Sequence, residues 1–335
     1  MADSRSPASP PPPGLVNSLM AGFDATASHL ALILFPIALD LLLWLGPHLR
    51  IKQVVEATLQ QMMIFPGSDS PQTAEMMRIN LEMWHNIGDR VNLLALLRTY
   101  PVGIPSLMAG SQPVEAPGGT PLFVEMTSFA SIAGLALLFT LAGLLLGTLY
   151  YSLVAQAALD QQVNLSKALQ TWPKASLQVI GLTFVLSALL LSVLLPTLSL
   201  VSVLVLVGLP LGQCALFALG GLLLWLAFPL LLAAHGIFVN GDNLFASIVA
   251  SIRLSRQTLP TTSLLFLSIV VLSQGLNLLW SVPDESSWVM LVGVGGHAFV
   301  TTALLAGSFV YYRQAEKWIA TLAARRAEQG PKPAA

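Results

Sequence analysis

The sequence predicts an all-α integral membrane protein: a bundle of six transmembrane helices, arranged as three helical hairpins that each follow an amphipathic cytoplasmic helix. Of its 335 residues, 55% are hydrophobic and only 9% are charged, whereas soluble domains average about 25% charged residues. Four long runs contain no charged residue: 126–159, 175–241, 257–283 and 286–312. Because about 20 apolar residues cross a bilayer as a helix, each run is long enough to span it.

The amino-terminal region is predicted to contain a tail, an amphipathic helix and one span. Residues 1–14 are rich in proline, which predicts a disordered tail. Residues 15–48 are predicted to hold the amphipathic helix and the first span, from about His29 to Pro47.

Residues 49–126 are predicted to form a helical insert outside the bilayer. Apolar residues at helical spacing predict one helix over residues 51–65. Ser70 followed by Pro71 predicts the start of a second helix, whose apolar stripe extends to Leu97. Residues 100–121 are rich in proline and glycine and are predicted to be non-helical.

The insert is also rich in methionine, since seven of the ten methionines lie between Met62 and Met126. Flexible Met side chains suit surfaces that accept variable apolar partners. Two interpretations of the insert remain open. It is either a lid or docking surface for a lipid or another membrane subunit, or a helical flap that rests on the membrane with Met as ordinary filler, and the sequence favours the flap. The candidate surface residues are Met62, Met63, Met76, Met77 and Trp84. The repeated Met spacing that copper sites favour is absent, so no metal site is predicted.

Spans two to six are predicted within residues 127–312, at about 128–151, 177–207, 211–239, 262–281 and 288–312. The uncharged run of residues 175–241 allows either two long spans or three short ones. The turn formers Gly208, Pro210 and Gly212 favour two, with kinks predicted at Pro196 and Pro229.

Basic residues decide the orientation, because they are enriched in cytoplasmic loops. Six spans place ten of the fifteen basic residues on one side: Arg5, Lys167, Lys174, Arg253, Arg256, Arg313, Lys317, Arg325, Arg326 and Lys332. Seven spans would separate Arg253 and Arg256 from Lys167 and Lys174. We therefore expect a multi-pass protein of the inner cell membrane with both termini cytoplasmic, in which residues 313–335 form a cytoplasmic helix and tail.

Three cytoplasmic segments resemble one another and precede the three hairpins. Each places an asparagine (Asn17, Asn164 or Asn243) where a helix N-cap is expected, followed by apolar residues at helical spacing. The second and third segments are predicted to end at Pro173 and Pro260. Such helices are expected to lie at the membrane interface with their basic residues toward anionic headgroups.

Four polar residues fall inside predicted spans: Asp40, Gln274, Asn277 and His297. Polar groups at this depth are costly and are candidate functional residues. If they meet at one level, they form a hydrated pocket or an Asp–His proton pair. The alternative is a structural contact in which Asp40 is satisfied by His297, a backbone group or a water. The Gly143 and Gly147 spacing is expected to allow close helix contact.

The sequence indicates no molecular activity. It contains no nucleotide-binding loop, no zinc-protease motif and no nucleophile elbow, so an enzyme ranks below two other classes. No basic stripe suggests nucleic acid, no cofactor is predicted, and a single cysteine, Cys214, excludes a disulfide framework. The leading hypothesis is a non-enzymatic scaffold or complex subunit. The alternative is a small transporter or lipid-handling protein with a polar midplane cavity.

Some stretches resemble a known group of proteins. His235-Gly236-Ile237-Phe238-Val239-Asn240, and Ala298-Phe299-Val300-Thr301-Thr302 to Tyr311-Tyr312, look like uncharacterised polytopic membrane proteins of filamentous, green non-sulfur-type bacteria. More distantly, the repeated plan is similar to the membrane domain of some glycerophosphodiester phosphodiesterases, whose catalytic domain has no counterpart here. The resemblance implies a polytopic fold and supplies no activity, cofactor or site residue.

Overall fold

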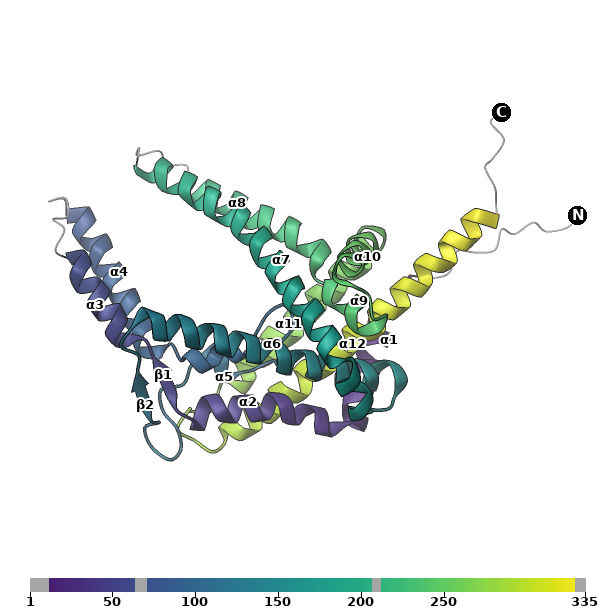
Figure 1. Cartoon of the computed structure of the whole chain (residues 1–335), viewed down its shortest axis with the longest axis horizontal. Helices are drawn as coiled ribbons and strands as arrows, with labels where there is room; N and C mark the ends of the chain where they lie inside the picture. The colour runs from purple at the N-terminus through teal and green to yellow at the C-terminus, as the bar shows by residue number, and fades with distance from the viewer. Residues whose placement is uncertain (1–11, 64–70, 207–211, 329–335) are drawn as a thin grey trace, which may run out of the picture. The chain divides into compact units, whose positions relative to one another are not determined.

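The structure is a computed structural model that describes residues 12–63, 71–206 and 212–328, and it is mostly helical (Figure 1). In this described part, five helices are long and apolar enough to cross a membrane, or six if a bent helix pair near the amino terminus is one span. The predicted helical class is confirmed, and spans of this kind imply contact with the lipid bilayer.

The chain divides into two compact units. Unit 1 comprises Met1–His29, Tyr151–Val271 and Ala303–Ala335, and unit 2 comprises Leu30–Tyr150 and Leu272–Thr302. Three helices contribute residues to both units: α6 (Phe129–Asp160), α11 (Leu259–Trp280) and α12 (Met290–Glu328).

The described residues of unit 1 contain helices joined by short turns and no strand. Its remaining elements are α1 (Leu15–Ser28), α7 (Leu165–Leu206), α8 (Gly212–Ala227), η3 (Phe228–Leu230), α9 (Ala233–Val239) and α10 (Leu244–Gln257). Helices α7 and α8 run side by side (Figure 1). The turn predicted at residues 208–212 falls almost wholly outside the described residues. Pro229 lies in η3, which separates α8 from α9, so the predicted interruption at this proline is confirmed.

Two of the three predicted N-caps are confirmed. The side-chain oxygen of Asn164 accepts a hydrogen bond from Lys167 N, and that of Asn243 accepts one from Ala246 N, each at 2.9 Å. The first prediction is wrong, because Asn17 lies inside α1 and Gly14 is the N-cap. The expected end at Pro173 is also wrong, since α7 is 42 residues long and continues through this proline to Leu206. A proline removes one helical hydrogen bond, which neighbouring helices can compensate in a membrane protein.

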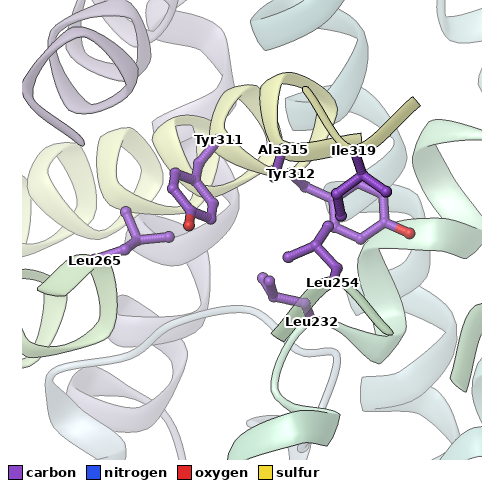
Figure 2. Close-up of a cluster of buried hydrophobic side chains, with 7 residues drawn as sticks. All are labelled: Leu232, Leu254, Leu265, Tyr311, Tyr312, Ala315 and Ile319. Atoms are coloured by element: carbon purple, nitrogen blue, oxygen red, sulfur yellow. The ribbon is translucent and has the colours of Figure 1, made fainter. Parts of the chain in front are cut away.

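Unit 1 has a hydrophobic core where α12 packs against three other segments (Figure 2). Its buried members are Leu232, Leu254, Leu265, Tyr311, Tyr312, Ala315 and Ile319. The Tyr311 hydroxyl lies 2.9 Å from both the Thr261 and Thr262 hydroxyls, so it is buried with hydrogen-bond partners, as a buried phenol requires.

Unit 2 carries the insert. Its remaining elements are η1 (Leu30–Ile33), α2 (Leu34–Leu45), β1 (His48–Arg50), α3 (Lys52–Met63), α4 (Pro71–Arg90), η2 (Leu93–Leu97), α5 (Met108–Ser111) and β2 (Phe123–Glu125). The two predicted insert helices correspond to α3 and α4, which pack against each other. However, α4 ends at Arg90, and the predicted extension of its stripe to Leu97 is replaced by a 3-10 helix.

A short parallel pairing closes the insert at its base. β1 pairs with β2 in the register His48 to Phe123, Leu49 to Val124 and Arg50 to Glu125. The guanidinium of Arg50 lies 3.3 Å from the centre of the Phe123 ring, close enough for a cation–π interaction. The two ends of the insert are therefore fastened together where they meet the spans.

Candidate functional site

Asp40 of α2 is fully buried and binds a segment of the insert. Its carboxyl group accepts hydrogen bonds from the Ser106 hydroxyl at 2.5 Å, from Leu107 N at 3.2 Å and from Met108 N at 3.0 Å. The sequence left open whether His297, a backbone group or water satisfies Asp40. The structure gives it backbone groups and a serine.

The segment that Asp40 holds, Leu93–Ser111, is called the anchored segment below. Most of it is coil and much of it is buried, including Val102, which has no exposed surface. It also packs on α6, where Gly143 lies against Leu97 and Thr99 and Gly147 lies against Gly103. The predicted Gly143 and Gly147 contact face therefore receives this coil rather than a helix.

The contact with α6 lies far along that helix. Gly147 is about 27 Å from Phe129, the first residue of α6, at 1.5 Å of rise per residue. The sequence placed the whole insert outside the spans, whereas the structure makes the anchored segment part of the helix packing in unit 2. Coil at membrane depth is tolerated where protein buries it, because its backbone polar groups must find partners without water.

Arg98 adds a positive charge to the anchored segment. Its guanidinium donates a hydrogen bond to the Ser106 carbonyl at 3.1 Å and lies 5.5 Å from the centre of the Tyr100 ring. Arg98 thus contacts Ser106, the residue whose hydroxyl donates to Asp40.

His297 of α12 pairs with Asn277 of α11. The ring Nδ1 donates to the Asn277 side-chain oxygen at 2.8 Å, which leaves Nε2 as a hydrogen-bond acceptor. Nε2 is buried and has no hydrogen-bond partner among the described residues, and His297 as a whole is 3% exposed. Gln274 lies exposed on α11 and does not join this group. Of the four predicted polar residues, the structure brings His297 and Asn277 together, whereas Asp40 binds the anchored segment.

The predicted outer surface is described only in part. The side chains of Met62, Met63, Met76 and Met77 lie outside the described part of α3 and α4. Trp84 is 43% exposed on α4. On the same helix, Ile79, Met83 and Ile87 follow one another at four-residue spacing and line a groove of about 630 Å³, which Glu82, Asn86 and Arg90 also line. Ile79 is 56% exposed and Met83 is 46% exposed.

Two titratable groups at the base of the insert have shifted pKa values. Burial lowers the pKa of His48, and the neighbouring Arg50 charge lowers it further, although the hydrogen bond to the Leu43 carbonyl acts in the opposite direction. The hydrogen bond and charge of Asp89 raise the pKa of Lys52, and these two groups form a 2.8 Å ion pair between α3 and α4. These contacts fix the base of the α3–α4 hairpin.

Sequence reasoning missed Arg98 and Ser106. Arg98 falls within the insert predicted to lie outside the bilayer, where a charged side chain is expected, and Ser106 carried no signal. A usable signal was the apolar stretch Leu93–Leu97 directly before Arg98, which resembles buried rather than surface sequence.

The described residues contain no group of three or more His, Cys, Asp or Glu side chains that could hold a metal ion. No protein-family model matches the chain, and neither the curated proteins nor the solved structures yielded a match. The function is therefore argued from the geometry alone.

Proposed function

We propose that this protein is a non-enzymatic scaffold or complex subunit of the inner cell membrane, which presents the α3–α4 hairpin to another membrane subunit. The observation that carries the proposal is that Asp40 binds the insert. This polar residue, which would be a candidate transport group, binds the anchored segment of the insert through three hydrogen bonds. The resemblance to polytopic proteins of green non-sulfur-type bacteria remains part of the proposal.

The proposed topology has six spans in three hairpins with both termini in the cytoplasm. It is supported by the basic residues, because Lys167, Lys174, Arg313 and Lys317 then lie on one side. Cysteine placed at Lys174 or Arg325, in a chain whose Cys214 is replaced by alanine, is expected to react with a thiol reagent confined to the cytoplasm. Reaction only from the outer side would overturn the topology.

The proposed docking surface is the α4 groove. The groove combines an apolar stripe with Glu82 and Arg90, which suits an amphipathic helix of a partner that would place its apolar face on the stripe and polar groups against these charges. The base of the hairpin is fixed by Asn92, whose side-chain oxygen accepts hydrogen bonds from Leu49 N and Leu94 N, each at 3.1 Å. A surface held in this way loses less conformational freedom when it binds.

Photo-crosslinking in cells tests this surface. A photoreactive amino acid at Met83 is expected to form a covalent adduct with a second polypeptide, identified by mass spectrometry. The matched control is the same amino acid at Leu137 of α6, an apolar residue that is 63% exposed on a candidate span. Leu137 is expected to give adducts with lipid. Lipid adducts alone at Met83 would contradict the subunit proposal and favour a flap that rests on the membrane.

The second candidate function is transport or lipid handling, and one observation favours it. The buried Nε2 of His297 has no hydrogen-bond partner in the described part of the chain. A water in a polar cavity would satisfy this nitrogen, and such a cavity is what a transport site needs.

Thiol labelling separates the two functions. With Cys214 replaced by alanine, cysteine at His297 is expected to stay unreactive toward a small, charged thiol reagent if unit 2 is packed and dry. Rapid labelling from one side of the membrane would show water at that position and favour transport. Because Lys317 is exposed, Lys317→Cys serves as the positive control that the thiol reagent is active.

A further inference from the structure

A polar pocket in unit 1 has no role in the proposed scaffold function. It has a volume of about 370 Å³ and lies between the carboxyl-terminal part of α6, the first turns of α7, the end of α9 and α12. Lys167, Thr171, Lys174 and Gln178 line it from α7. Their spacing of three or four residues places them on one face of that helix.

The pocket is rich in hydrogen-bond donors. The side-chain oxygen of Gln156 accepts from Asn164 N at 2.8 Å, and that of Gln178 accepts from Leu244 N at 2.7 Å. Because backbone N–H groups can only donate, these bonds fix both amides with their NH₂ groups available as donors. Together with the cations of the pocket, they form a set of donors that a multiply charged oxygen anion would satisfy.

The charges in the pocket leave one cation unpaired. Asp160 lies between Lys167 and Arg313, at 3.8 and 3.9 Å, so both pairs are looser than direct hydrogen bonds. Asp242 also lines the pocket, where it accepts a hydrogen bond from Asn240 at 3.4 Å. Lys174 is exposed and forms no ion pair with any described residue. Three cations therefore face two carboxylates.

Part of the pocket lining is apolar. Ile237 and Phe238 of α9 contribute to it, and Phe238 packs against Tyr151 with ring centres 5.5 Å apart. We propose that this pocket binds a phosphate group. Its lining, which is partly polar and partly apolar, suits the headgroup and glycerol of an anionic phospholipid. Basic pockets between spans on the cytoplasmic side are suited to such headgroups. Only the choice of leaflet rests on the proposed topology.

Lipid binding by the full-length protein tests the proposal. Native mass spectrometry in mild detergent, with added phosphatidylglycerol or phosphatidylcholine, is expected to show one phosphatidylglycerol retained in preference. Lys174→Gln is expected to weaken its binding about fivefold, the contribution of one basic residue near an anionic lipid. The matched control, Lys317→Gln, removes an exposed lysine of α12 outside the pocket and is expected to bind as the original chain does.

A second measurement, with inorganic phosphate as the probe, distinguishes a lipid ligand from a soluble one. Inorganic phosphate that binds the protein in a Lys174-dependent manner, without a preference for phosphatidylglycerol, would support the phosphate site and assign it a soluble ligand. Equal losses in Lys174→Gln and Lys317→Gln, or binding of neither probe, would overturn the site. Thermal unfolding of both variants checks that they fold, and Lys167→Gln provides a second variant within the pocket. Crosslinking at Met83 is independent of these outcomes.

Discussion

In unit 1, Gly22 of α1 lies against Ala303 and Gly307 of α12, so two regular helices approach each other closely. In unit 2, Gly143 and Gly147 of α6 lie against the coil of the anchored segment instead. Small residues permit both approaches, since a side chain would collide with the neighbouring backbone. The same local pattern in the sequence therefore serves two different kinds of contact.

The two contacts differ in what they demand of the surroundings. A helix satisfies its own backbone groups, so the α1–α12 contact needs no outside donor or acceptor. Buried coil in unit 2 needs partners for its N–H groups, and Asp40 supplies them to Leu107 and Met108. The glycines of unit 2 thus depend on a polar residue elsewhere in the chain, whereas those of unit 1 do not.

The largest effect is expected from Asp40→Ala. It removes the acceptor of two buried N–H groups and one hydroxyl, so the free energy of unfolding is expected to fall by about 3 kcal/mol or more. Thermal unfolding in mild detergent, with limited proteolysis of residues 93–111, measures the loss. Asp24→Ala, an exposed residue of α1, is the control and is expected to change stability by less than about 0.5 kcal/mol. Equal stability of the two variants would contradict the role of Asp40.

Gly147→Ala is expected to have the next largest effect. The new methyl group would collide with Gly103 of the anchored segment, and such overpacking costs about 1–3 kcal/mol. Gly134→Ala in the same helix has open space around it and is expected to stabilise by up to about 1 kcal/mol through helix propensity. Unfolding curves of both variants give the comparison. A stabilising Gly147→Ala would mean that the coil does not lie against α6.

Gly22→Ala tests the corresponding helix contact in unit 1. Its methyl group would meet the backbone of Ala303 and Gly307, so a loss of about 1–3 kcal/mol is expected here too. The two variants are expected to differ in the protease sensitivity of the anchored segment. Gly147→Ala is expected to expose residues 93–111 to protease, whereas Gly22→Ala is expected to leave them protected. Equal protease sensitivity in both variants would show that the insert does not depend specifically on unit 2.

The sequence predicted those features of the fold that depend on neighbouring residues, such as helices and N-caps. Hydrophobic runs located the helices, and Asn164 and Asn243 were recognised as N-caps because capping involves neighbouring residues. Asn17 has the same pattern and lies inside a helix, since Gly14 begins that helix. The candidate site depends on residues far apart in sequence: Asp40 and Ser106 are 66 positions apart. No periodicity encodes that pairing, so the sequence could nominate Asp40 and His297 without showing that Asp40 binds the insert and that His297 binds Asn277.

The pH dependence of the insert base is expected to follow His48. Burial lowers the pKa of its imidazole in the folded protein, so the unfolded chain binds the proton more readily. Stability is therefore expected to be complete well above the unfolded value of about 6.5 and to fall as the pH drops below it. Unfolding measured at several pH values should show this loss, reduced in His48→Gln relative to the original chain. An unchanged slope in the variant would mean that other groups cause the dependence.

The smallest effect is expected from the ion pair between Lys52 and Asp89. It joins α3 to α4 at 2.8 Å, yet the two side chains are 40% and 46% exposed. Water and salt screen exposed pairs, whose contribution is about 0–1 kcal/mol. Lys52→Ala should therefore lower the free energy of unfolding by less than about 1 kcal/mol, and 0.5 M salt should abolish most of that difference, since the screening length is then only about 4 Å. Asp40→Ala should keep its full effect in the same salt, because its hydrogen bonds are buried. If both losses vanish with salt, the anchored segment is held by surface charge rather than by buried hydrogen bonds.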